Sequence, residues 1–140
     1  MRQEFFNYQV NTNGQQLYEF TSEIVQWVNK NKFKNGILNL NIQHTSASLI
    51  VQENADPDVQ TDLVNYFNKL VPMDKSLYIH TTEGKDDMPA HIKSSLTNNQ
   101  ITLSIKNSEI ILGTWQGLYL FEHRLDPVSY THLTLPTRAV

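Results

Sequence analysis

Hydrophobic and polar residues alternate with a period of two along several short stretches of this chain. The clearest cases are Leu38, Leu40 and Ile42, and a second run, Ile101, Leu103 and Ile105. This spacing is typical of strands with one buried face. The turn signal at residues 11–14 predicts that the first two strands pair as a hairpin. The stretches that predict strands are residues 4–10, 15–20, 37–42, 49–51, 101–105, 110–112 and 118–123.

Helical spacing of apolar residues follows in three other stretches. The first helix is predicted from residue 21 or 22, with Ser22 as N-cap and Trp27 on its core face. The second begins at Pro57, capped by Asp56, and a short third helix begins near Pro89 and ends near residue 98. The predicted core face of the second helix is Val59, Leu63, Tyr66, Phe67 and Leu70.

The order of these elements predicts the fold class. It is strand, strand, helix, strand, strand, helix, short helix, and then three strands. This order favours an α+β fold with mainly antiparallel sheets covered by two main helices. At 140 residues, with no internal repeat or linker, residues 1–125 are expected to form one domain.

Composition narrows the chemistry. A net charge of −3 gives no basic surface for nucleic acid. The sequence has no cysteine, so a metal would have to bind His, Asp or Glu. No apolar run reaches membrane-spanning length and no signal-type segment stands at the N-terminus, so we expect a cytoplasmic protein.

Histidines are the main candidate metal ligands. We predict a triad of His44, His91 and His123, with His80 as reserve or outer-shell partner, because these residues lie on separate elements. Three protein ligands would leave an open position on zinc. The alternative for each is a hydrogen-bonded, half-buried side chain.

The polar stretch at residues 80–91 also carries carboxylates. Glu83 and Asp87, with the neighbouring Asp86, are predicted either to hold a hard cation or to cap the following helix and pair with Lys85 or Lys93. Glu83 and Asp87 join His44 and His91 as the predicted catalytic residues.

Phosphate binding is predicted at two cations and three hydroxyls. Arg124 offers a planar fork and Lys93 a point charge. Trp115, beside Gln116, would stack on a heterocycle or else fill a core or subunit boundary. The full set of predicted substrate contacts is Thr45, Ser46, Ser48, Lys93, Trp115, Gln116 and Arg124.

Four motifs together resemble the YjbQ family, also called secondary thiamine-phosphate synthase enzymes. They are His44-Thr45-Ser46-Ala47-Ser48, Glu53-Asn54-Ala55-Asp56-Pro57, Glu83-Gly84 with Asp86 to Lys93, and Gly113-Thr114-Trp115-Gln116-Gly117 with Glu122-His123-Arg124. The resemblance implies a small homotrimer with a polar, metal-capable pocket. It also implies transfer of hydroxymethylpyrimidine from its diphosphate to a thiazole phosphate, with release of pyrophosphate. The implied cofactor is zinc, or magnesium with the diphosphate, and the partners are a small phosphorylated heterocycle and other copies of the chain. The alternatives are a metal- or phosphate-ligand-binding protein without turnover and a structural homotrimer.

The last residues, 126–140, do not fit the domain. They resemble a translated sequencing adaptor read through in frame, which predicts that the native chain is lost after about Arg124 and that a final native strand is missing. The alternative is a genuine β-tail that pairs with a sheet edge.

Overall fold

Two antiparallel sheets and three α-helices make up the part of the chain that the structure describes. The computed structural model describes residues 1–127 and the backbone of residues 131–139. The strands are β1 (Arg2–Val10), β2 (Gln16–Glu19), β3 (Gly36–Ile42), β4 (Ala47–Glu53), β5 (Gln100–Lys106), β6 (Glu109–Ile110), β7 (Gln116–Glu122) and β8 (Thr131–Ala139). The helices are α1 (Thr21–Lys30), α2 (Pro57–Leu70), the short 3-10 helix η1 (Lys75–Leu77) and α3 (Asp87–Leu96). The α+β fold predicted from the sequence is confirmed.

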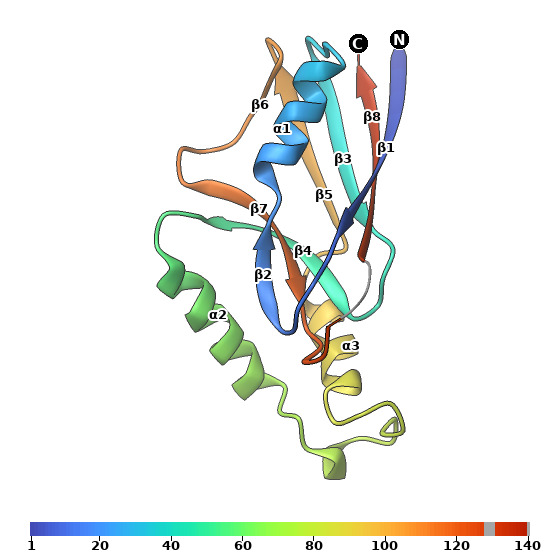
Figure 1. Cartoon of the computed structure of the whole chain (residues 1–140), viewed down its shortest axis with the longest axis vertical. Helices are drawn as coiled ribbons and strands as arrows, with labels where there is room; N and C mark the ends of the chain where they lie inside the picture. The colour runs from blue at the N-terminus through green and yellow to red at the C-terminus, as the bar shows by residue number, and fades with distance from the viewer. Residues whose placement is uncertain (128–130, 140) are drawn as a thin grey trace.

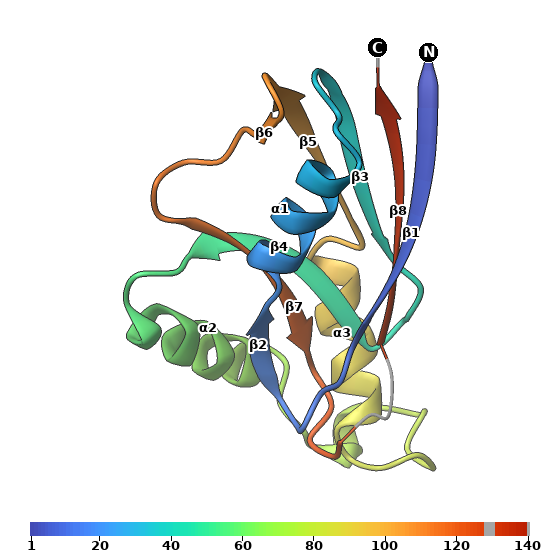
Figure 2. The same ribbon diagram turned by 45° about the horizontal axis from the view of Figure 1, so that its top comes forward.

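The elements stack in layers. One sheet has the order β1-β8-β3-β5-β6 and the other β2-β7-β4. In Figure 1, α1 lies in front of the larger sheet, while α2 extends from the lower left of the smaller one. The view in Figure 2 shows the two sheets and α1 together in the body of the molecule, with α3 below β4.

Strand β7 lies between two hydrophobic clusters. Leu118 and Leu120 join the main core with β3, β4, β5 and α1. Tyr119 and Phe121 form a second cluster with Leu17, on the other face of the same strand. A run of consecutive apolar residues is what a strand buried on both faces requires. The strand ends at Glu122. Its packing on both faces therefore sets the position of the residues that follow Glu122.

The predicted hairpin between the first two strands is wrong. β1 pairs with β8, and β2 pairs with β7. The reason is that Phe6 and Tyr8 of β1 pack against the main core, whereas Leu17 of β2 belongs to the second cluster. The turn therefore carries the chain from one sheet to the other.

The helix ends give one confirmation and one correction. Asp56 is the N-cap of α2, and its side chain accepts a hydrogen bond from the Asp58 N–H at 2.9 Å. Helix α1 instead begins at Thr21 after Phe20, without a side-chain cap, so Ser22 is not its N-cap. The Thr21 hydroxyl accepts a hydrogen bond from the Leu118 N–H at 2.9 Å and so contacts β7.

The apolar face of α2 is less buried than predicted. None of its residues is fully buried, and Tyr66 and Leu70 are 60% and 53% exposed. Only Leu63, Val64 and Phe67 pack against the second cluster. The helix covers a narrow three-stranded sheet, which is too small to bury the whole apolar face.

The C-terminal residues form a central strand. β8 lies between β1 and β3 and is antiparallel to both. Residues 128–130 and 140 lie outside the described part of the chain. Residues 131–139 occupy this place in the sheet, and the loss of a native strand stays a prediction. The adaptor origin of residues 126–140 stays a prediction.

Candidate functional site

Three side chains converge at the N-terminal end of α3. His80 Nε2 lies 2.7 Å from Asp87 Oδ2, and His91 Nε2 lies 3.2 Å from the same oxygen. The three ligand atoms all lie within 4.8 Å of one another. We call His80, Asp87 and His91 the His-Asp-His cluster.

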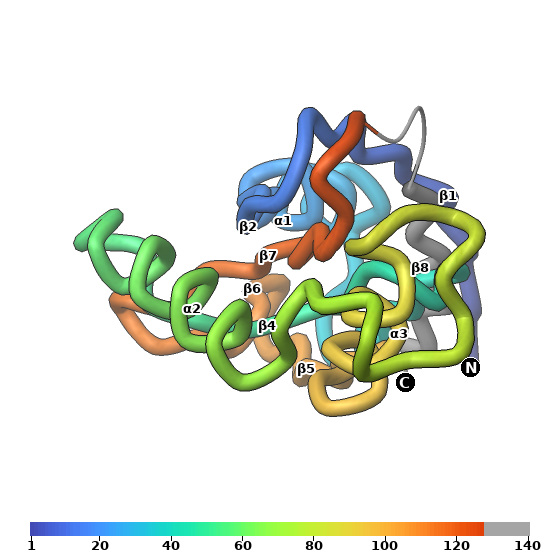
Figure 3. The backbone as a smooth tube through the Cα atoms, turned by 90° about the horizontal axis from the view of Figure 1, so that it is seen from below, coloured from blue at the N-terminus to red at the C-terminus, as the bar shows by residue number. Residues whose placement is uncertain are grey.

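Local structure explains this convergence. Asp87 is the first residue of α3 and His91 lies one turn further on, so their side chains share a face of the helix. His80 comes from the segment before the helix; seen from below in Figure 3, this yellow-green segment loops beside α3. His91 Nδ1 donates to the Thr45 carbonyl at 3.0 Å, which leaves Nε2 as the ring nitrogen directed to the cluster.

Arg124 supports the cluster from the end of β7. Its Nε donates to Asp86 Oδ2 at 3.0 Å, its Nη2 donates to the Glu83 carbonyl at 3.0 Å, and its Nη1 donates to Asp87 Oδ1. Gly84, with φ +109°, makes the left-handed turn that follows Glu83. All three guanidinium nitrogens are therefore engaged with protein groups.

The electrostatics keep the carboxylates charged. Burial by itself would raise the pKa of Asp87, but the hydrogen bond with His80 and the charges of Arg124 and His91 outweigh it, and the pKa is lowered. Burial likewise opposes ionisation of Asp86, and its bonds with the Leu125 N–H and Arg124 lower its pKa. An ionised carboxylate is the form that can bind a cation.

The donor set fits a divalent metal. Two imidazole nitrogens and one carboxylate oxygen resemble the three-ligand sets of catalytic zinc sites, which keep one position open. Asp87 is buried, whereas His80 and His91 are partly accessible, with side chains 44% and 32% exposed. One side of the cluster therefore faces solvent, from which a ligand can approach.

Asp86 does not act as a helix cap. It occupies the N-cap position of α3, but its side chain makes no capping hydrogen bond and binds Arg124 and the Leu125 N–H instead. Glu83 is exposed, with its carboxylate 3.9 Å from His80 Nε2, at the edge of the cluster.

The predicted triad of His44, His91 and His123 does not come together in the structure. Within the described residues, the only such group of three is His80, Asp87 and His91. His44 and Thr45 line a neighbouring cavity of about 230 Å³ together with His91, on the side of Ser94 and Ser95. His44 therefore lies near the cluster, but it is not one of the three residues that meet there. His80, rather than His44, lies beside Asp87 and His91.

His123 is buried in a different environment. It is fully buried, its Nε2 lies 2.9 Å from Ser48 Oγ, and its ring packs 4.3 Å from that of Phe121. Its Nδ1 has no hydrogen-bond partner among the described residues. Burial, with a smaller effect of the Lys93 charge, lowers the pKa of His123 to about 3. The ring is therefore a neutral interior group.

Two predicted substrate contacts also lie in the interior. Ser48 is fully buried beside His123. Lys93 is fully buried too, and its Nζ donates to Asn68 Oδ1 at 2.6 Å. Burial lowers the pKa of Lys93 to about 8. Ser46 contributes its carbonyl oxygen, which accepts from the His123 N–H at 3.3 Å.

Trp115 and Gln116 lie at the other end of β7. Trp115 is 63% exposed, and the Gln116 carboxamide accepts a hydrogen bond from the Gly113 N–H at 2.7 Å. A strand rises about 3.3 Å per residue, so the length of β7 puts roughly 20 Å between Gln116 and Glu122, and Arg124 lies beyond Glu122. Within one chain these residues do not meet the cluster.

Comparison with known proteins decides the family. Residues 6–134 match the family described as UPF0047 protein YjbQ-like. The chain belongs to this family.

Relatives within the family support the assignment at the level of sequence and fold. A UPF0047 protein of Synechocystis is 52% identical over 116 residues, which cover 83% of this chain and 79% of that protein. YjbQ of Salmonella typhimurium is 49% identical over 90 residues, and the match spans only 64% of its length. The crystal structure of an uncharacterized conserved YjbQ/UPF0047 protein from Clostridium acetobutylicum superposes with a TM-score of 0.82 at 29% identity, covering 96% of this chain and 99% of that one.

The sequence predicted His80 only as a reserve ligand. Of the two roles predicted for Asp86, the structure excludes the helix cap, because its side chain binds Arg124 and the Leu125 N–H. The i, i+4 spacing of Asp87 and His91 could have marked one face of the cluster, but the predicted helix began only near Pro89 and left Asp87 outside it. No sequence signal marked the meeting of Arg124 with Asp86, because the two residues are 38 positions apart and pair only in the folded chain.

Proposed function

We propose that this UPF0047 protein binds a divalent metal ion at His80, Asp87 and His91 and uses it to hold a phosphorylated substrate. The convergence of both histidine Nε2 atoms on Asp87 Oδ2 carries this proposal. Zinc is the first choice because of the two imidazoles, and magnesium the alternative when a diphosphate completes the coordination.

The proposed reaction is of the thiamine-phosphate synthase type. The bond between the pyrimidine methylene carbon and the diphosphate oxygen breaks, and pyrophosphate leaves with the electron pair. The lone pair of the thiazole nitrogen then forms the new C–N bond, which leaves the positive charge on a thiazolium ring. A bound divalent ion would supply positive charge at the departing diphosphate oxygens.

The protein's own residues have supporting tasks in this proposal. The Thr45 carbonyl orients His91, and Arg124 orients Asp87 and Asp86. The exposed Glu83 and the cavity lined by His44, Thr45 and Ser94 lie beside the cluster, where a heterocycle would bind. Lys93 and Arg124 are positioning residues, because their polar atoms are already bonded to protein groups.

We also propose that the working form is a homotrimer. Several large apolar side chains on α2 and on the segment that follows it are exposed, and packing against other copies would bury them. They are Tyr66, Leu70, Leu77 and Ile79, with Ile79 fully exposed and next to His80.

A paired measurement tests the function. Zinc-loaded protein is incubated with hydroxymethylpyrimidine diphosphate and thiazole phosphate, and pyrophosphate and the coupled product are quantified. We expect both to form in equal amounts, and both to disappear in His91→Ala. Bound zinc with ligand-dependent stabilisation but no product would favour the binding protein. Loss of the trimer in His44→Ala, without either property, would favour the structural role.

A further inference from the structure

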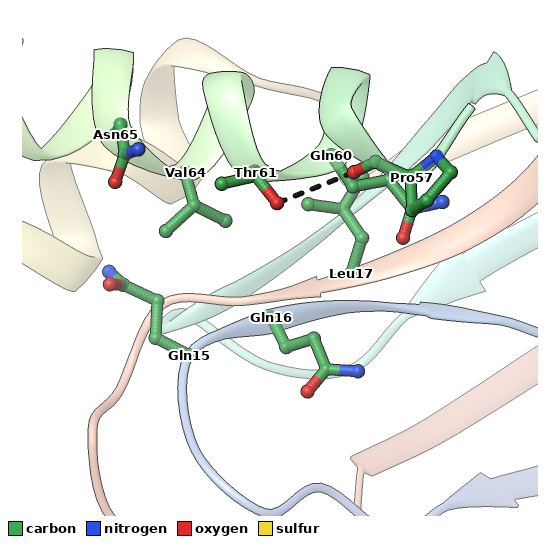
Figure 4. A pocket seen from close by; sticks show the side chains of 8 residues that line it. All are labelled: Gln15, Gln16, Leu17, Pro57, Gln60, Thr61, Val64 and Asn65. Carbon is green, nitrogen blue, oxygen red and sulfur yellow. Dashed lines mark hydrogen bonds between the residues drawn. The ribbon is translucent and has the colours of Figure 1, made fainter.

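A second cavity lies away from the metal ligands, between α2 and β2. Its volume is about 350 Å³, which is in the range of small-molecule sites. Figure 4 shows Asn65, Val64 and Thr61 extending from α2 toward the side of the groove formed by Gln15 and Leu17. We call it the amide groove, because its lining residues are Gln15, Gln16, Leu17, Pro57, Gln60, Thr61, Val64 and Asn65.

The groove has an apolar floor and an uncharged polar rim. Leu17 is buried and Val64 half-buried, and both pack in the second hydrophobic cluster. Four carboxamides and a hydroxyl surround them, and no lining residue carries a charge. A phosphate or carboxylate would find no cationic side chain among these lining residues. A flat, uncharged ring could pack on the apolar floor and form hydrogen bonds with the polar rim through its edges.

Two carboxamides on the rim are held in place by the protein. Gln60 Nε2 donates to the Tyr119 hydroxyl at 3.1 Å, which turns its carbonyl oxygen away from Tyr119. Gln15 and Asn68 exchange two hydrogen bonds, of 3.0 and 2.9 Å, and Lys93 braces Asn68 from α3. The groove is thus largely preformed, which reduces the ordering cost of binding.

Two other carboxamides are available to a ligand. Gln16 and Asn65 are exposed, and their side chains make no hydrogen bond to any described residue. A carboxamide presents a donor and an acceptor side by side, the arrangement that pairs with the amino group and ring nitrogen of adenine.

We propose that the amide groove binds an uncharged aminated heterocycle of the adenine type, independently of the metal ligands. The ring would lie on Leu17 and Val64, with its amino edge paired to the carboxamide of Asn65 or Gln16. No lining residue is shared with the His-Asp-His cluster, so occupancy of the groove does not require metal.

Adenine itself is the probe. Metal-free, isotope-labelled full chain is titrated with adenine while the side-chain amide resonances are followed by NMR. We expect saturable shifts at Gln16, Gln60 and Asn65, with N6,N6-dimethyladenine binding at least about threefold more weakly because it lacks the amino donors.

Variants provide the matched control. Asn65→Leu keeps a side chain of similar size and should weaken adenine binding roughly three- to tenfold, the loss of one or two neutral hydrogen bonds. Gln26→Leu removes an exposed carboxamide on α1, outside the groove, and should leave the affinity for adenine unchanged. If Asn65→Leu does not fold, Gln16→Leu takes its place.

Three results would overturn the proposal. The first is the absence of a saturable shift up to the solubility limit of adenine. The second is equal affinity for adenine and its dimethyl derivative. The third is an unchanged affinity for adenine in both groove variants. If an extended peptide, instead of adenine, produces the shifts, the proposal is also overturned. The groove would then serve strand addition along β2, the edge strand of its sheet.

Discussion

Arg124 holds one oxygen of the Asp87 carboxylate and leaves the other to the histidines. Its Nη1 donates to Asp87 Oδ1, while Asp87 Oδ2 lies 2.7 Å from His80 Nε2 and 3.2 Å from His91 Nε2. The arginine thereby sets the direction of the only carboxylate in the cluster.

Removal of Arg124 should therefore affect the metal before it affects a phosphate. We expect Arg124→Ala to weaken zinc binding roughly 10- to 100-fold, the usual effect of losing a group that orients a metal ligand. Arg124→Lys should restore only part of the affinity, since one ammonium cannot reach Asp86, Asp87 and the Glu83 carbonyl together. Competition with a chromophoric chelator measures this. Unchanged zinc affinity with weaker phosphate binding would make Arg124 the phosphate clamp expected from the sequence.

Zinc stoichiometry distinguishes the two histidine sets. We expect about one zinc ion per chain, lost in His80→Ala and in His91→Ala, because each removes one of three ligands. His44→Ala is the control and should keep its zinc. Elemental analysis after gel filtration gives the counts. Retention in His80→Ala together with loss in His44→Ala would restore the triad predicted from the sequence.

His123 should make the fold sensitive to acid. Its pKa is about 3 in the folded chain against an ordinary value of 6.5, so between these values the unfolded chain binds the extra proton. Stability is thus complete above pH 6.5 and falls as the pH is lowered toward 3. From pH 7 to pH 5 the loss would be about 2 kcal/mol.

Urea unfolding at pH 7 and pH 5 tests this linkage. His123→Gln cannot titrate, so its free energy of unfolding should change less between the two pH values than that of the unaltered chain. Equal pH dependence in both proteins would show that folding does not lower the pKa of His123.

The exposed apolar residues predict an assembly. In a homotrimer that buries Ile79, Ile79→Asp should dissociate the complex, because an unpaired charge would have to be buried. Ile111→Asp alters another exposed isoleucine, on the loop before β7, and serves as the control. Sedimentation velocity of the three proteins measures the result. A concentration-independent monomer for the unaltered chain would contradict the prediction.

Strand β8 should be essential for the larger sheet. It is the partner of both β1 and β3, so a chain ending after residue 127 would leave β1 without its partner and β3 with an open edge. We expect that variant to bind a hydrophobic dye and to lose its cooperative thermal transition. A sharp transition at an unchanged temperature would contradict this expectation. Reading the source locus past codon 124 independently tests the origin of residues 126–140.

The sequence by itself determined most of the helices and strands. Alternation placed Leu38, Leu40 and Ile42 in the core, and the Asp56-Pro57 pair marked the start of α2. These features depend on neighbours within a few residues, and such interactions are visible in the order of residues along the chain.

Only the tertiary structure decided which distant groups meet. His80 joins the cluster because a loop returns to α3, and Arg124 reaches Asp86 because β7, buried on both faces, ends beside the same helix. His123 follows the same strand but points into the interior, where burial keeps it neutral. The position in which β7 delivers these two residues, rather than the type of residue, therefore separates a positioning arginine from a buried histidine.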